Sequence, residues 1–199
     1  MESGFPPNRA HEIVHKISQL LEKRNETIAV SEAACGGLMS SYLVSVPGAS
    51  SWFHGGTTVY SLKSRLKLSG WSEEDIQNYT GPSVEVALRL ARNLKFELGA
   101  TYTLSETGFA SDSSRFVPKS KTQSVGTVYL GLSGPSRDLS EVFNSGSTNR
   151  CHNMQEFAIH GLEFLLKEIE HVDRASQPSS SEEEFEPELV SKKQKLPKK

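Results

Sequence analysis

The sequence has little cysteine, no long apolar run and no large excess of charge of one sign. Its two cysteines, Cys35 and Cys151, are not at a metal-ligand spacing. The N-terminus lacks the apolar core of a secretory signal, so we expect both cysteines to be free thiols in a reducing compartment. No segment is long and apolar enough to span a membrane. The formal net charge is −2, so no overall attraction to nucleic acid or lipid is expected.

Hydrophobic residues make up only 36% of the 199 residues, and the shortage lies mainly at the C-terminal end. There, Ser179–Glu184 is followed by the lysine-rich segment Lys192–Lys199. We predict that residues 173–199 form a disordered charged tail, because they bury too little apolar area to offset the entropy of ordering. The lysines resemble a nuclear-localisation patch. We therefore predict a cytoplasmic, intracellular protein, with nuclear targeting as the alternative, and the neighbouring acidic run makes nucleic-acid binding unfavourable.

Between the termini, helical apolar patterns alternate with short strand-like runs, which predicts one α/β domain over residues 10–172 after a flexible lead-in at residues 1–9. The predicted helices are Ala10–Glu22, Gly36 to Val46, Ser61–Leu68, a short one capped by Ser72, Ser83 to Gly99, and Met154–Val172. The predicted strands are Thr27–Val30, Thr57–Tyr60, Tyr102–Ser105, Val125–Leu132 and an edge strand at Leu139–Phe143. A polar loop is expected at Ser111–Ser124.

The turn after the first strand is the most informative segment. Thr27–Val30 runs into the small residues Ser31–Gly37, and a helix follows. A helix start presents unpaired backbone N–H groups and a partial positive charge, so it suits an anion or a carbonyl oxygen. In an open α/β sheet, ligands bind at the carboxyl ends of strands. We therefore expect a ligand site here, with the backbone N–H groups of the turn as oxyanion donors.

Five segments, in this order, resemble the CinA C-terminal domain family, whose enzymatic members are nicotinamide mononucleotide amidohydrolases. Ser31–Gly37 is similar to the family pattern A-E-S-x-T-G-G, and Val46–Ser50 to V-P-G-S-S. Gly55–Ser61 matches G-G-x-x-x-Y-S, and Thr107–Asp112 aligns with T-G-x-A-G-P. Val125–Tyr129 matches the strand V-G-T-V-Y. The resemblance covers nearly all of residues 10–170 and implies a three-layer α/β/α domain.

The resemblance also implies an active-site serine with tyrosine and lysine partners, and here the sequence departs from the family. Ala33 stands at the position of the nucleophilic serine and has no group that can attack a carbonyl. Arg65 replaces the lysine, and a guanidinium stays protonated, so it cannot act as a general base. The A-G-P part of the later loop becomes Ala110–Asp112. Tyr60 and Thr107 are retained.

Two residues offer a substitute nucleophile. Cys35 lies at the start of a helix, where the dipole lowers a thiol pKa, but the alternative is an inert buried thiol in place of threonine. Ser31 lies two residues before Ala33, on the same side of an extended segment, but would need the backbone to move. Glu32 is expected to cap backbone N–H groups of the turn or to orient a pocket residue.

The remaining candidates each have a structural alternative. Gly36 and Gly37 fit either a ligand pocket or tight helix packing, and Tyr60 either the pocket or a core phenol. Lys63 and Arg65 could each bind the phosphate of a ligand. The default interpretation for either residue alone is a solvated charge on a helix. The predicted catalytic candidates are Cys35 and Tyr60. The predicted ligand-binding residues are Ser31, Glu32, Gly36, Gly37, Gly55, Gly56, Arg65, Thr107, Gly108 and Arg150.

The hypothesis favoured by these residues is a domain that binds a nucleotide-type ligand, similar to nicotinamide mononucleotide, after losing the serine chemistry. The alternatives are an active amidohydrolase that uses Cys35 or Ser31, and a non-enzymatic scaffold whose tails recruit partners. No cofactor and no metal site are predicted, since His152 and His160 show no metal-ligand pattern. The family resemblance implies self-association as a homo-oligomer.

Overall fold

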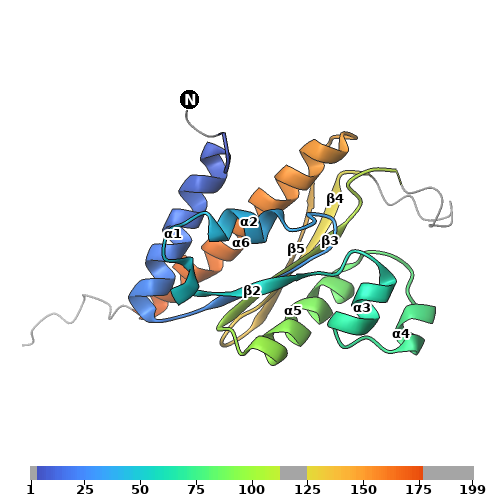
Figure 1. The fold of residues 1–199 in the computed structure, drawn as a ribbon, viewed down its shortest axis with the longest axis horizontal. Helices are drawn as coiled ribbons and strands as arrows, with labels where there is room; N and C mark the ends of the chain where they lie inside the picture. Colours follow the sequence, from blue (N-terminus) through green and yellow to red (C-terminus); the bar gives the residue numbers. More distant parts are fainter. Residues whose placement is uncertain (1–3, 113–124, 177–199) are drawn as a thin grey trace, which may run out of the picture.

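A computed structural model of the chain describes residues 4–112 and 125–176 (Figure 1). The elements in chain order are α1 (Asn8–Arg24), β1 (Ile28–Glu32), α2 (Leu38–Val44), a short 3-10 helix (Ala49–Ser51), β2 (Phe53–Thr58), α3 (Leu62–Leu68), α4 (Glu73–Gln77), α5 (Val84–Leu98), β3 (Tyr102–Gly108), β4 (Thr127–Ser133), β5 (Asp138–Asn144) and α6 (Arg150–Ser176). The alternation of helices and strands predicted from the sequence is confirmed. Residues 177–199 of the predicted tail and most of the predicted polar loop lie outside the described residues, whereas residues 173–176 belong to α6.

The five strands form one mixed sheet in the order β2-β1-β3-β4-β5. Strand β1 is parallel to both β2 and β3, whereas β4 is antiparallel to β3 and β5 is antiparallel to β4. Ser31 of β1 is level with Thr57 on one side and with Ser105 on the other. The carboxyl ends of β1, β2 and β3 therefore lie together at one end of the sheet. Strand β5 is the last in the strand order and is an edge strand, as predicted.

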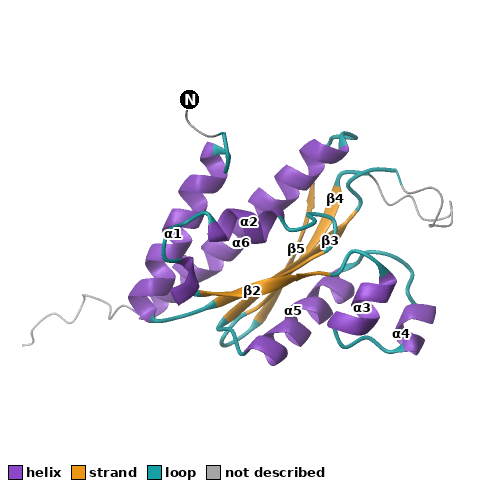
Figure 2. Cartoon of the chain, in the orientation of Figure 1, coloured by secondary structure: helices purple, strands orange, loops and turns teal. Residues whose placement is uncertain are grey.

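Helices cover both faces of the sheet (Figure 2). Helices α1, α2 and α6 lie on one face, and α3, α4 and α5 lie on the other. Adjacent residues of β4 show the two layers, because a Cβ at Gly131 would meet Ala87 of α5, whereas Leu130 lies against Gly161 of α6. The three-layer α/β/α arrangement is confirmed.

Local sequence explains the buried face of α1 and the caps of α4 and α5. Helix α1 buries Ala10, Val14, Ile17 and Leu21, which recur at helical spacing. The Ser72 hydroxyl caps α4, and the Asp75 carboxylate bonds back to the Ser72 backbone N–H, as in a capping box. Helix α5 ends at Gly99, whose φ of 63° lies in the left-handed region that favours glycine, so the predicted stop is confirmed.

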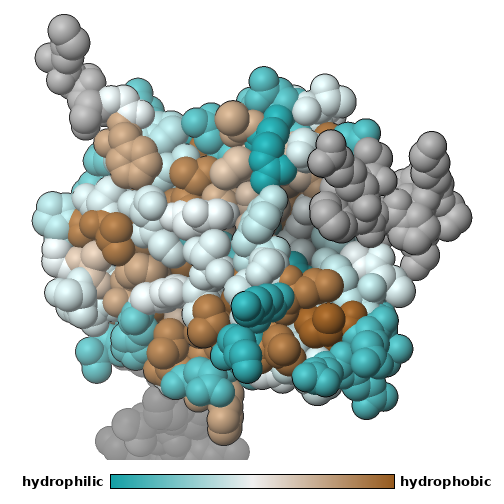
Figure 3. Space-filling model, turned by 45° about the vertical axis from the view of Figure 1, so that its right-hand side comes forward, coloured by the Kyte–Doolittle hydropathy of each residue, from teal (hydrophilic) through white to brown (hydrophobic). Residues whose placement is uncertain are grey.

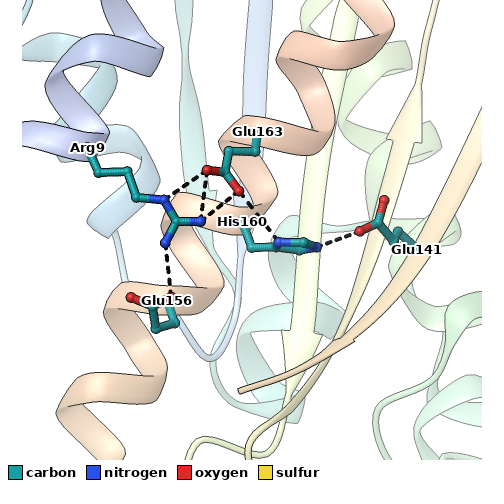
Figure 4. Close-up of polar contacts among 5 residues, drawn as sticks. All are labelled: Arg9, Glu141, Glu156, His160 and Glu163. Atoms are coloured by element: carbon teal, nitrogen blue, oxygen red, sulfur yellow. Dashed lines mark hydrogen bonds and ion pairs between the residues drawn. The ribbon is translucent and has the colours of Figure 1, made fainter. Parts of the chain in front are cut away.

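A polar network joins α1 to α6 and α6 to β5 (Figure 4). The guanidinium of Arg9 donates to both carboxylate oxygens of Glu163, at 2.9 and 2.8 Å, and to Glu156 at 3.2 Å. Nε2 of His160 lies 2.5 Å from the Glu141 carboxylate of β5. The network anchors one flank of α1 and the edge strand to the same helix.

Several predicted boundaries are wrong for identifiable reasons. Strand β2 lies at Phe53–Thr58 rather than Thr57–Tyr60, because the backbone pairing with β1 runs through the glycine pair. Helix α2 begins at Leu38 rather than Gly36, because Gly36 and Gly37 have positive φ angles of 66° and 104°. Helix α6 begins at Arg150 and ends at Ser176, beyond the predicted Met154–Val172.

Candidate functional site

Glu32, the last residue of β1, binds the first turn of α2 with both carboxylate oxygens. Its Oε2 accepts hydrogen bonds from the backbone N–H groups of Gly37 (2.9 Å) and Met39 (3.1 Å). Its Oε1 accepts from the backbone N–H of Ser40 (2.8 Å) and from the Ser40 hydroxyl (2.7 Å). These N–H groups have no acceptor inside the helix, so the carboxylate satisfies them and complements the helix dipole. The prediction that Glu32 caps this turn is confirmed.

A second buried carboxylate, that of Glu106 in β3, binds the turn itself. Its Oε1 accepts from the backbone N–H groups of Ala33 (2.6 Å) and Cys35 (2.8 Å). The side chain is fully buried, and Oε2 has no hydrogen-bond partner in the described part of the chain. Burial raises the pKa of Glu106 to about 7, against the opposing effect of the Cys35 N–H, and the nearby Glu32 raises it further.

The two carboxylates occupy backbone donors that we expected to serve a ligand. The N–H groups of Ala33 and Cys35 donate to Glu106, and that of Gly37 donates to Glu32. The prediction that these groups are available as oxyanion donors is therefore wrong for this conformation. Sequence reasoning missed Glu106, although a carboxylate directly after the predicted strand Tyr102–Ser105 was a usable signal, because a buried charge must find donors.

The structure gives no candidate nucleophile an activating environment. Ala33 is only 4% exposed and carries a methyl group. Cys35 is completely buried, and desolvation together with Glu106 and Glu32 raises its thiol pKa well above the usual value. The expected lowering of that pKa by the helix dipole is therefore wrong. Ser31 is also buried, and its hydroxyl accepts a hydrogen bond from Thr57 at 3.3 Å.

Arg65 of α3 is buried on the face of the sheet that α3, α4 and α5 cover. Only 3% of the residue is exposed, so the default prediction of a solvated helix charge is wrong. Its Nε donates to the carbonyl of Val59 and its Nη2 to the hydroxyl of Thr107, both at 3.2 Å. The guanidinium also lies over the rings of Trp71 (5.3 Å) and Tyr79 (5.0 Å), an arrangement that stabilises a desolvated cation. Nη1 has no hydrogen-bond partner among the described residues.

Tyr60 and Arg150 meet at the surface. Nη2 of Arg150, the first residue of α6, donates to the Tyr60 hydroxyl at 3.0 Å, and Nη1 donates to the Ser111 hydroxyl at 2.9 Å. Tyr60 is 63% exposed, so the alternative of a core phenol is wrong. The pair brings together the loop after β2, the segment after β3 and the start of α6. Lys63, by contrast, is exposed on α3 as its default interpretation predicted.

The predicted glycines have packing reasons of their own. A Cβ at Gly56 would lie 2.8 Å from the side chain and carbonyl of Val30 and from the Ser40 hydroxyl, so the backbone of β2 approaches β1 and α2 too closely for a larger residue. A Cβ at Gly108 would lie 2.5 Å from the Thr127 carbonyl. Gly55 has a φ of 118°, which only glycine adopts readily. A ligand-binding role for these glycines stays a prediction.

Most of the predicted residues fall into three groups at the carboxyl ends of β1, β2 and β3. The first is the turn after β1 with Glu32, to which the structure adds Glu106. The second is Arg65 with Thr107, and the third is Tyr60 with Arg150. Among residues 4–112 and 125–176 there is no group of three His, Cys, Asp or Glu side chains placed to hold a metal ion. No described helix is long and apolar enough to cross a membrane.

Comparison with known sequences identifies relatives over most of the chain. The profile of the CinA C-terminal domain matches residues 10–169. A CinA-like protein of Amoebophilus asiaticus is 28% identical over 154 residues, and one of Prochlorococcus marinus (strain NATL2A) is 32% identical over 156 residues. The matched stretches cover 77% and 78% of this chain but only 36% and 35% of those proteins. The chain thus spans about a third of the length of these relatives.

Solved structures share the fold at lower identity. A competence or damage-inducible protein from Enterobacter asburiae superposes with a TM-score of 0.73 at 17% identity, over 81% of this chain and 99% of that one. The competence/damage inducible protein CihA from Agrobacterium tumefaciens gives a TM-score of 0.73 at 20% identity, over 81% and 96% of the two chains. At these identities the likeness concerns the fold alone.

Proposed function

The chain belongs to the CinA C-terminal domain family, and on that premise we propose that it binds a ligand similar to nicotinamide mononucleotide without hydrolysing it. Amide hydrolysis by acyl transfer needs a nucleophile, an activating base and oxyanion donors. Ala33 supplies no nucleophile, Arg65 supplies no base, and the N–H groups of Ala33 and Cys35 donate to Glu106. The observation that carries the proposal is the methyl group of Ala33, whose own N–H is bonded to an internal carboxylate.

Arg150 is the residue best suited to hold the ligand phosphate. It lies at the carboxyl ends of the parallel strands, where ligands of open α/β sheets bind. It is exposed, and its Nη atoms already bond the Tyr60 and Ser111 hydroxyls, so the guanidinium is oriented before a ligand arrives. A planar guanidinium makes strong, paired hydrogen bonds to phosphate. Tyr60, 63% exposed beside it, offers a ring and a hydroxyl to the rest of the ligand.

The alternatives have less support. An active hydrolase that uses Cys35 needs a thiolate, and burial beside Glu106 and Glu32 raises the pKa of that thiol. Ser31 is buried with no base bonded to its hydroxyl in the described part of the chain. Self-association stays a prediction. The face drawn in Figure 3 mixes hydrophobic and hydrophilic areas. Among the described residues, the most exposed large apolar side chain is that of Phe96.

The test is to incubate the purified chain with nicotinamide mononucleotide, and to measure both ammonia release and the shift in thermal unfolding. We expect no ammonia and a rise in the unfolding temperature, because a ligand that binds only the folded state stabilises it. Arg150→Ala should weaken binding about tenfold or more, the cost of a lost charge-assisted hydrogen bond. The matched control is Arg92→Ala, since Arg92 is an exposed arginine that pairs with Asp138 at the opposite edge of the sheet.

Two results would overturn the proposal. Ammonia release that disappears in Cys35→Ala would show that hydrolysis has been retained through the thiol. Absence of both ammonia and a thermal shift would show that the chain does not bind nicotinamide mononucleotide. Equal weakening by Arg150→Ala and Arg92→Ala would refute the assignment of the phosphate to Arg150.

A further inference from the structure

Helix α1 carries two histidines one turn apart. Residues 11–15 have the sequence His-Glu-Ile-Val-His, the H-E-x-x-H spacing at which a helix presents two imidazoles to one metal ion. In the structure, Nε2 of His11 and Nε2 of His15 are 3.1 Å apart, and the ring centroids are 4.3 Å apart. His11 is exposed and His15 is partly exposed. The two ring nitrogens therefore converge at a place that solvent reaches.

The separation of these nitrogens fits two adjacent ligands of a single ion. Imidazole nitrogens bind Zn²⁺ at about 2.0–2.1 Å. Two nitrogens 3.1 Å apart, each at that distance from a common ion, make an angle of about 95–102° at the ion. This value lies between the angle of about 90° in octahedral sites and that of about 109° in tetrahedral ones. The two nitrogens can therefore bind one ion without a change in their separation.

The helix beneath the pair is held firmly on its other sides. Val14, next to His15, and Ile17 are fully buried in the core. Arg9 lies two positions before His11, about 200° around the helix, and bonds Glu156 and Glu163 of α6 (Figure 4). Because the backbone is already fixed, binding an ion costs little additional ordering.

We propose that His11 and His15 bind a divalent transition-metal ion through their Nε2 atoms, with water in the remaining coordination positions. Imidazole is a suitable ligand for Zn²⁺, Ni²⁺ and Cu²⁺. In the metal-free protein, the Nε2–H group of one ring donates a hydrogen bond to Nε2 of the other ring. When the ion binds, that proton moves to Nδ1 of the donor ring, and both Nε2 lone pairs are then available to the metal.

The site is a binding site and not the centre of a zinc hydrolase. Catalytic zinc centres have three protein ligands. Within the two described stretches of the chain, no further His, Cys, Asp or Glu completes a group of three with His11 and His15. Glu12 occupies the position of the general base in that motif. With only two protein ligands beside it, however, it has no catalytic zinc centre on which to act. This inference is independent of the nucleotide site, which lies at the carboxyl ends of the strands.

The experiment is a titration of the full, untagged chain with Zn²⁺ under reducing conditions, followed by calorimetry and by NMR of the imidazole nitrogens. We expect one Zn²⁺ per chain and shifts of the Nε2 resonances of His11 and His15. Binding should be lost in His15→Gln and in His11→Gln. The matched controls are His152→Gln and Cys151→Ser, which remove exposed potential ligands from α6. Both controls should bind Zn²⁺ as the unchanged chain does.

Three results would refute the site. They are no Zn²⁺ binding by the unchanged chain, undiminished binding by His15→Gln, and loss of binding in either control instead. Far-ultraviolet circular dichroism distinguishes loss of the site from loss of the fold, and we expect all four variants to keep the spectrum of the unchanged chain.

Discussion

Replacing Glu106 with glutamine should remove a pH dependence of stability that the buried carboxylate creates. Burial raises its pKa from 4.5 to about 7. The folded state then binds more protons than the unfolded state between these values, so the free energy of unfolding decreases as the pH rises through them. The stabilisation is fully present below about pH 4.5 and is lost as the pH rises through about 7. At 1.36 kcal/mol per pH unit, the interval corresponds to about 3 kcal/mol.

Glutamine keeps the shape of the side chain and a carbonyl oxygen for the N–H groups of Ala33 and Cys35, but it cannot ionise. The free energy of unfolding of Glu106→Gln, relative to that of the unchanged chain, should therefore increase by about 3 kcal/mol from pH 4.5 to pH 8. Urea denaturation at several pH values measures this difference. Glu97→Gln, an exposed position on α5, is the matched control and should leave the pH profile unchanged. Parallel profiles for Glu106→Gln and the unchanged chain would refute the reasoning.

Two further predictions concern packing and surface charge. Gly56→Ala would place a Cβ 2.8 Å from Val30 and Ser40 and should lower the free energy of unfolding by about 1–3 kcal/mol, as measured by urea denaturation. The control is Gly4→Ala, because a Cβ at Gly4 meets nothing within 4 Å. Equal stability of the two variants would contradict the close approach at Gly56. Arg9→Ala breaks ion pairs in which the arginine side chain is 50% exposed and each glutamate 27%, so the loss should be less than about 1 kcal/mol and should shrink in high salt. A salt-independent loss of several kcal/mol would show that these pairs are not screened.

The fold could be predicted where local sequence carries the information. Helix α5 is an example, because its cap at Ser83, its apolar face and its stop at Gly99 are all nearest-neighbour signals. Strand β1 was predicted to end at Val30 because Ser31 and Glu32 are polar, yet both are buried and belong to the strand. Their burial depends on partners in other elements, which a pattern along one segment does not contain.

The site divides in the same way. The capping role of Glu32 was predictable because its acceptor atoms serve N–H groups five to eight residues away. The contacts of Glu106 join residues 71 and 73 positions apart, and that of Arg65 with Thr107 joins residues 42 apart. Such contacts exist only in the folded sheet, so the sequence alone left Arg65 as either a phosphate ligand or a solvated charge and gave Glu106 no role.

The bond between Glu106 and the backbone of Ala33 also limits what a hydroxyl introduced by Ala33→Ser could do. The N–H groups of residues 33 and 35 would still donate to the Glu106 carboxylate, so they could not bind the negative charge that develops on a carbonyl oxygen under attack. Arg65 would still hold its proton and could not take one from the new hydroxyl. A single substitution in the turn is therefore not enough to assemble a hydrolytic centre, because the neighbouring strand and helix also contribute to it.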